Sequence, residues 1–496
     1  MSSGRSSLRD SLGHPFMPNS LPDAKAAMLK AIGAPSIEAL FEQIPADHRC
    51  QQPLSLPDAI PSEAELRAHL IELLSKNTSC EDNLSFLGGG CWRHYVPAVC
   101  DEIVGRSEFL TSVWGTSSSD HGRNQAWFEF CSQLGELLGL EMVGLPVYSW
   151  GCAAGHALRM ASRMTQRRRV LVPLNLCPER LSIIRNYCGL PQMADHIQVE
   201  RVDFDRHSGL LSVADLKRRL GASGAARGAA TSSASGADAD SSGAVAAVYI
   251  ETPSFLGLIE PRMNEIAKLA HDAGAEFVVG VDPISLGVLA APAEYGADIV
   301  VGSTQPLGVH MHGGGGLGGF IASRDEPRYA HEYPTLMLSI ADTTAPGEIG
   351  FGMSLMHQSS YGSREKGKDW TGNSTYLWAI ASAVYMSMLG PAGFQELGSV
   401  ILQRSHYAAR RLAEIEGIHV PFASGFFKEL VVNVDETGRT IADLNRALPK
   451  AGIFGGQDLS ASFPELGQSA LYCITELHTR ADIDRLVRAI REWIRS

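Results

Sequence analysis

The chain has 496 residues, a formal net charge of −12, 45% hydrophobic residues and 19% charged residues. This is the composition of a globular protein, and the length is sufficient for two to three domains with cores. The acidic balance, without a long basic run, argues against a nucleic-acid-binding protein. No uninterrupted stretch of about 18 apolar residues occurs, so no membrane span is expected. Lysine is scarce, with nine lysines against 33 arginines.

The cysteines and the N-terminus indicate a cytosolic protein. There are nine cysteines, an odd number, and none is spaced as C-x-x-C, which is typical of reduced thiols. The first sixteen residues have no apolar core of the kind found in signal peptides.

The first part of the chain is predicted to be helical. Ser62 and Glu65 form the pattern of a capping box, and Leu66, Leu70, Leu73 and Leu74 then fall on one helix face. Residues 86–95 contain three consecutive glycines and are predicted to be a loop. A second helix is predicted from about residue 125, with Phe128, Cys131, Leu134, Leu137 and Leu138 at helical spacing.

The middle of the chain alternates between strand and helix patterns, which predicts a mainly parallel α/β sheet with crossover helices. Residues 221–244 are almost entirely Gly, Ala, Ser, Asp and Thr, so we expect an insertion without a packed core there. The predicted strands are 170–173, 197–204, 245–250, 277–281 and 298–302, and the predicted helices are 178–188, 213–220 and 260–273.

The last hundred residues predict a smaller α+β unit. Residues 430–434 and 470–475 read as strands and 441–451 as a helix. A final helix begins with the capping-box pair Thr479 and Asp482 and places Ile483, Leu486, Val487, Ile490 and Ile494 on one face. The domain prediction is therefore a helical segment over 1–115, a large α/β domain over 116–385 and a small domain over 386–496.

Asp282 is the first candidate for chemistry. It follows a predicted strand, and the carboxyl ends of strands in open α/β sheets are where ligands bind. A carboxylate there could pair with the pyridinium nitrogen of a cofactor. With equal weight, it could simply cap the turn before Pro283.

Three further segments have more than one interpretation. The glycine-rich stretch 302–320 suits close backbone approach or a phosphate cradle, and His310 and His312 within it lack a third metal ligand, so a packing or interface loop is favoured. Residues 151–161 could bind a phosphate at a helix start or pack closely, and packing is preferred. Residues 362–374, with Lys366 and Lys368, read as a solvated loop, with an anion-binding or gating loop as the alternative.

Long segments of the chain resemble glycine decarboxylase, the P-protein of the glycine cleavage system, specifically its amino-terminal half, which is a separate subunit 1 (alpha) in many bacteria and archaea. The resemblance covers nearly the whole chain apart from 221–244. Its segments are HPFMPNSLPDAKAAMLKAIG (14–33), IEALFEQIP (37–45), 84–112, ISLGVLAAPAEYGADIVVG (284–302) with QPLG (305–308), REK (364–366), LGPAGFQEL (389–397), GFFKELVV (425–432), GIFGG (452–456) and CITELHTRADID (473–484).

This resemblance implies fold type I of the pyridoxal-phosphate (PLP) enzymes, with a large α/β domain and a small C-terminal α+β domain. It implies decarboxylation of glycine and transfer of the aminomethyl group to the lipoyl arm of H-protein, with PLP as the electron sink. It also implies a partner: the beta subunit carries the PLP lysine, and two alpha and two beta subunits assemble. Since mitochondrial versions are similar but fused into one long chain, a half-length chain indicates a prokaryotic cytoplasm.

The lysine positions add a further expectation. In the beta subunit the Schiff-base lysine precedes the glycine run by seven residues, and the same offset from Gly313 falls on Pro306, which has no amine. Lys268 falls on a predicted helix, Lys366 is not used as a Schiff base in the alpha family, and the other lysines lie in regions the family does not use. No catalytic residue is therefore expected in this chain, PLP is expected to be bound mainly by the partner, and Asp282 loses most of its pyridinium interpretation.

The loops expected to face the shared site depart from the alpha pattern. G-A-G-A-Y-D-H-Y becomes GGGCWRHY over 88–95, which keeps His94 and Tyr95, and the segments 114–122 and 367–373 also differ. The sequence thus predicts a glycine decarboxylase subunit whose pocket is lined by a specific set of side chains. The alternatives are a divergent homologue that acts with a lysine-bearing partner on another amino acid, and a non-catalytic pseudo-subunit. The predicted pocket-lining residues are His94, Tyr95, Asp282, Gln305, His312, Arg364 and Lys366, with Arg364 and Lys366 binding anionic groups.

Overall fold

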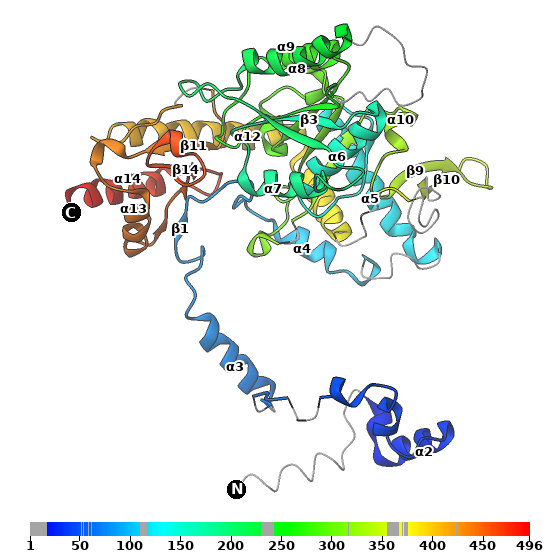
Figure 1. Ribbon diagram of the computed structural model, residues 1–496. Helices are drawn as coiled ribbons and strands as arrows, with labels where there is room; N and C mark the ends of the chain where they lie inside the picture. The colour runs from blue at the N-terminus through cyan, green and yellow to red at the C-terminus, as the bar shows by residue number, and fades with distance from the viewer. Residues whose placement is uncertain are drawn as a thin grey trace. The chain divides into compact units, whose positions relative to one another are not determined.

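The computed structural model describes residues 17–496, with gaps, and divides the chain into two units, Met1–Asn77 and Thr78–Ser496 (Figure 1). Each unit is considered by itself. The gaps are residues 51, 53, 58, 61, 110–116, 230–242, 316, 355–366, 370, 372–374 and 423–424, and the side chains of 18, 117–122 and 222–229 are also outside the description.

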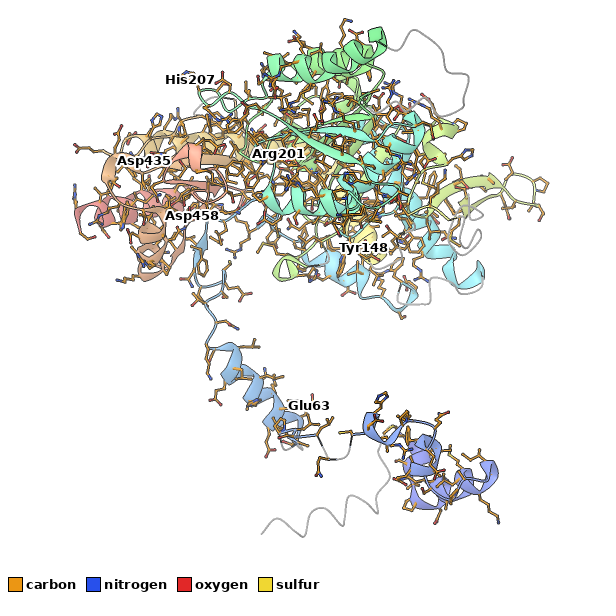
Figure 2. All side chains as sticks on the ribbon, in the orientation of Figure 1. Glu63, Tyr148, Arg201, His207, Asp435 and Asp458 are labelled. Atoms are coloured by element: carbon orange, nitrogen blue, oxygen red, sulfur yellow. The ribbon has the colours of Figure 1, made fainter. Side chains whose placement is uncertain are left out.

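The described part of the N-terminal unit is built from helices α2 (Pro22–Ile32) and α3 (Glu63–Leu74) and short 3-10 turns. Figure 2 labels Glu63 at the start of α3. Ser62 caps this helix, because its hydroxyl accepts a hydrogen bond from the Glu65 N–H at 3.1 Å, which is one of the two hydrogen bonds of the predicted capping box. The predicted apolar face of α3 is not buried: its four leucines are 43% to 63% exposed.

A seven-stranded sheet forms the centre of the second unit, in the order β2-β8-β7-β6-β5-β3-β4. β3 to β7 pair in parallel, and β8 is antiparallel to both β7 and β2. The strands are β2 (Met142–Val143), β3 (Arg169–Pro173), β4 (Gln198–Val202), β5 (Ala247–Glu251), β6 (Glu276–Val281), β7 (Ile299–Ser303) and β8 (Gly319–Ser323).

Helices cover both faces of this sheet, because side chains of buried strands alternate between the two faces. Along β5, Val248 and Ile250 join one hydrophobic cluster, whereas Ala247 and Tyr249 join another. The first cluster includes residues of α4 (Ala98–Val104), α5 (Ser117–Leu138), α8 (Val213–Ala229), α9 (Met263–Asp272) and α12 (Tyr376–Ala413). The second includes residues of α6 (Trp150–Thr165), α7 (Pro178–Tyr187) and α10 (Pro327–Ala330).

Within 302–320, some glycines serve close packing, whereas Gly313 and Gly314 face open space. A Cβ on Gly319, at the start of β8, would lie 2.1 Å from the Ser149 carbonyl oxygen, so only glycine fits there. The prediction of a loop over this whole stretch is wrong at its end, where β8 begins. A hairpin of β9 (Met337–Asp342) and β10 (Ile349–Ser354) was also not predicted.

The C-terminal part has its own core, between a three-stranded antiparallel sheet in the order β11-β14-β13 and residues of α13, α14 and the end of α12. Figure 2 labels Asp435 and Asp458 in this part. α14 starts with the predicted capping box of Thr479 and Asp482. The elements are β11 (Glu429–Asn433), α13 (Ile441–Ala447), β13 (Gln457–Asp458), β14 (Ser469–Cys473) and α14 (Arg480–Arg495), and β12 (Ile453–Phe454) pairs in parallel with β1 (Leu84–Ser85).

α12 is the one described helix with the length and apolar content of a membrane span. It is nevertheless a core helix, since fifteen of its residues are buried in the protein. Gly390, with φ 56° and ψ −178°, and Pro391 kink it near the predicted start of the small domain. The predicted insertion at 221–244 begins inside α8, which continues to Ala229.

Candidate functional site

Asp282 is buried at the carboxyl end of β6 and has two partners, one for each carboxylate oxygen. Oδ1 accepts a hydrogen bond from the Ile284 N–H at 3.1 Å, which confirms the capping interpretation. Oδ2 lies 2.7 Å from Nζ of Lys428, and the two side chains are only 4% and 3% exposed. The carboxylate at this ligand-binding edge of the sheet is therefore already paired with a cation from the chain itself.

Lys428 precedes β11 and connects Asp282 with the loop over 86–95. Its Nζ is 2.8 Å from Nε2 of His94 and 3.9 Å from the centre of the Trp92 ring. Because an ammonium group only donates, Nε2 of His94 acts as the acceptor and the ring proton sits on Nδ1. Sequence patterns assign this lysine no role, whereas the structure places it against both Asp282 and His94.

Glu476 holds the other side of His94. Its Oε2 is 2.7 Å from Nδ1 of His94, and its Oε1 accepts a hydrogen bond from the Tyr95 N–H at 2.6 Å. Burial by itself would raise the pKa of Glu476, but the His94 ring and the Tyr95 N–H outweigh it and lower the pKa to about 2. The His94 side chain is consequently fixed from both ring nitrogens, whereas Tyr95 is 61% exposed.

Gln305 and Glu429 anchor the same loop from two other elements. The Gln305 side chain accepts from the Trp92 N–H at 3.0 Å and donates to the Trp92 carbonyl oxygen at 2.8 Å. Glu429 accepts from the Gly89 N–H at 2.6 Å, and burial raises its pKa. The loop over 86–95 is therefore held by β11, by the segment after β7 and by the segment after β14.

Arg180 is another buried charged residue that lines the site. Its guanidinium makes a two-point contact with Glu251, at 2.7 and 2.8 Å, and lies 4.2 Å from the centre of the Trp150 ring. Burial opposes the charged form, but the attraction of Glu251 prevails and raises the pKa of Arg180. The cavity left among Trp92, Trp150, Arg180, Asp282, Lys428 and Glu429 measures about 10 Å³, which is room for one water.

These residues do not fit PLP in this chain. A carboxylate that binds the ring nitrogen and an amine that forms the Schiff base lie at opposite ends of the pyridine ring. Lys428 is in direct contact with Asp282, so no ring can lie between them, and Pro306, at the position expected for the Schiff-base lysine, has no amine. The cavity is also far smaller than the several hundred Å³ usual for a cofactor site.

The start of α6 packs closely, as the interpretation of residues 151–161 favoured. Ser149 caps the helix by accepting from the Cys152 N–H at 3.2 Å. A Cβ on Gly155 would lie 2.7 Å from Cβ of Tyr187, so this glycine is needed for contact with α7, and a Cβ on Gly151 would lie 2.8 Å from the end of the Ile183 side chain.

The structure does not bring all the predicted site residues together. Trp92 and Lys428 connect three of them. Gln305 holds the backbone of Trp92, and Lys428 contacts both Asp282 and His94. Tyr95 follows His94 in the sequence. His312 is exposed and its ring stacks on Trp378 with 4.8 Å between centroids. Arg364 and Lys366 lie outside the described residues, so their anion-binding role stays a prediction, whereas nearby Asp369 pairs with Arg159 at 2.7 Å.

Sequence reasoning missed Lys428, Glu476 and Trp92. Lys428 carried a readable signal, because a lone lysine inside the apolar run GFFKELVV is typical of a buried, paired ammonium. Glu476 had no such signal, since its partners lie more than 380 residues earlier in the sequence.

The sheet order, the carboxylate after β6 and the small C-terminal domain define fold type I of the PLP-dependent enzymes. A sphingosine-1-phosphate lyase from Burkholderia pseudomallei has this fold, with a TM-score of 0.61 at 12% identity over 90% of this chain and 93% of its own. A glycine decarboxylase (P-protein) of the glycine cleavage system, in inhibitor-bound form, superposes with a TM-score of 0.81 at 29% identity over 97% of this chain and all of that chain.

Sequence comparison places the chain more narrowly. Residues 16–490 match the glycine cleavage system P-protein family, and the chain belongs to this family. A protein of Staphylothermus marinus, named probable glycine dehydrogenase (decarboxylating) subunit 1, is 34% identical over 97% of this chain and 98% of its own length. A protein of the same name from Pyrococcus horikoshii is 35% identical over 97% of this chain and its own full length.

Proposed function

We propose that this chain is the non-lysine-bearing subunit of a glycine decarboxylase. It works with a beta subunit that carries the PLP lysine, and the pair decarboxylates glycine and passes the aminomethyl group to the lipoyl arm of H-protein. The relatives named subunit 1, matched over nearly their full length, support the split arrangement. The single observation that carries the division of labour is the Lys428–Asp282 contact, because it leaves PLP to be bound mainly by the partner.

In this proposal the chain contributes side chains to the mouth of the partner's pocket. Glu476 and Lys428 fix the orientation and tautomer of His94, while Tyr95 projects its exposed side chain beside it. Gln305 holds the backbone that carries both residues. Arg364 and Lys366 are proposed to bind anionic groups, His312 is proposed as a more distant lining residue, and the assembly is proposed to work in the cytoplasm.

The test is glycine–bicarbonate exchange with lipoylated H-protein. It is measured with this chain alone, with the beta subunit alone and with both. Exchange is expected only from the pair, and His94→Gln is expected to lower it by about 10- to 100-fold without preventing assembly. His48→Gln, a change of an exposed histidine in the N-terminal unit, is the matched control. Exchange by this chain alone would contradict the proposal.

A second function has one specific observation in its favour. The changed residues Gly90–Arg93 include Trp92, which covers Lys428 at the centre of the site. A changed pocket wall favours a homologue that acts with a lysine-bearing partner on another amino acid. Carbon dioxide release from a panel of amino acids by the same pair distinguishes the two: glycine as the preferred substrate supports the first proposal, and another amino acid supports the second. No release from any of them supports a non-catalytic pseudo-subunit.

A further inference from the structure

Lys428 is more deeply buried than a lysine can be without compensation. The residue is 2% exposed and lies between Phe427 and Glu429, which are equally enclosed. An isolated ammonium in such surroundings would cost several kcal/mol in lost hydration, so its partners must replace water.

Three groups take the place of that water. An ammonium offers three N–H donors, and around Nζ lie Oδ2 of Asp282, Nε2 of His94 and the face of Trp92. Only Asp282 carries a full opposite charge, while the ring nitrogen supplies a lone pair and the indole supplies its negative face. Asp282 follows β6, whereas His94 and Trp92 both belong to the loop over 86–95, so the lysine joins two separate parts of the chain at one point.

We propose that Lys428 is a built-in substitute for the ring cation of PLP. Its ammonium neutralises the carboxylate that the fold presents to a pyridinium. The lysine thereby occupies the position beside Asp282 at which a cofactor ring would otherwise bind in this chain. It is at the same time a positioning residue, because its hydrogen bond fixes the tautomer of His94. Only this second role rests on the proposed function; the first concerns the isolated chain.

The position of the amine excludes a hidden Schiff-base role. To form a Schiff base an amine must reach the carbonyl carbon, which is attached to the ring opposite the nitrogen. Lys428 instead contacts the carboxylate that serves the nitrogen end. The chain is consequently expected to form no borohydride-reducible adduct with PLP on this lysine.

The test uses the full chain without its partner and replaces the missing cation from solution. Lys428→Ala leaves Asp282 buried and unpaired and is expected to lower the melting temperature by roughly 5 °C. Methylammonium chloride is expected to recover at least half of that loss in a saturable way. Tetramethylammonium chloride, which is too large, and sodium chloride at equal ionic strength are expected to recover none.

The dependence on Asp282 separates this proposal from simple loss of packing. Methylammonium is expected to have no specific effect on Lys428→Ala/Asp282→Asn or on the unaltered chain. Equal stabilisation by all three salts would overturn the proposal, as would methylammonium rescue that survives the Asp282→Asn change. If Lys428→Ala does not fold, a second pair of variants is compared. Lys428→Met/Asp282→Asn is expected to fold and to be more stable than Lys428→Met alone. A double variant that is less stable than Lys428→Met would also overturn the proposal.

A spectroscopic measurement tests the positioning role. In chains labelled with 15N-histidine, the His94 resonance, assigned by its loss in His94→Gln, is expected to show the Nδ1–H tautomer and to leave it in Lys428→Ala. An unchanged His94 tautomer in that variant would refute the positioning role. These measurements involve no partner and no glycine. Their outcome therefore does not depend on whether the pair shows glycine–bicarbonate exchange. Conversely, a negative result on Lys428 does not contradict the proposed subunit role.

Discussion

Glu476→Gln tests whether the loop over 86–95 is held electrostatically from the C-terminal part. Glu476 lies just after β14, and its carboxylate receives hydrogen bonds from Nδ1 of His94 and from the Tyr95 N–H. Glutamine keeps the size of the side chain but removes the charge, and one of its two terminal atoms can no longer accept. The change therefore removes the charge-assisted contacts without opening a cavity.

The pKa of Glu476 falls from the usual value of 4.5 to about 2, and the side chain is only 15% exposed. This fall includes the attraction of a positively charged His94 ring, a contribution that a neutral ring accepting from Lys428 does not make. The hydrogen bonds to the carboxylate then give a stabilisation of about 1 to 3 kcal/mol. Because the folded-state pKa lies below the unfolded one, this stabilisation is complete above about pH 4.5. It is lost progressively as the pH falls from there towards 2.

Chemical denaturation at several pH values checks both the size and the sign. At pH 7 the free energy of unfolding of Glu476→Gln is expected to be lower than that of the unaltered chain by about 1 to 3 kcal/mol. This difference is expected to hold down to about pH 5 and then to shrink as the medium is acidified. The control is Glu436→Gln, an exposed glutamate of the same C-terminal part. A difference that stays constant or grows below pH 4.5 would refute the electrostatic reasoning.

Two further predictions concern the packing around the site. Gly155→Leu is expected to destabilise the chain by about 1 to 3 kcal/mol, because its Cβ would meet the Tyr187 side chain. The control is Gly221→Ala, which has open space in a helix and should be neutral or stabilising. Equal melting temperatures for the two variants would contradict this prediction. Arg180→Met should lower the free energy of unfolding by about 3 to 5 kcal/mol, because Glu251 is left buried without its cation. In urea denaturation, Arg180→Met/Glu251→Gln should recover most of this loss. No recovery would argue that the loss does not come from the unpaired charge.

Local patterns in the sequence predict most of the elements correctly. The capping serine at 62 and the capping box at 479–482 are both present, because a cap involves residues only three positions apart. The start of α5 was placed about eight residues late, since the polar run 117–124 has no apolar period to reveal it. Strand β8 was missed because glycines in a strand look like a loop until the close contact with Ser149 is known.

The site was predicted less completely than the fold. Asp282, Gln305 and His94 could be singled out, because a strand end and a family pattern mark them. Their arrangement could not be predicted, because it depends on contacts between residues more than a hundred positions apart, as between Trp92 and Gln305. Hydrogen bonds of this range are set by how the sheet and the C-terminal part fold together.

The sequence by itself determined the family, the fold type and the lack of an amine at Pro306, because these depend on residue identity and local order. Its scarcity of lysine indicated that the chain does not hold PLP covalently. Only the tertiary structure decided that one of those few lysines, Lys428, lies against Asp282. The physical reason is that a buried carboxylate requires a nearby positive charge, and only the folded chain determines which residue supplies it.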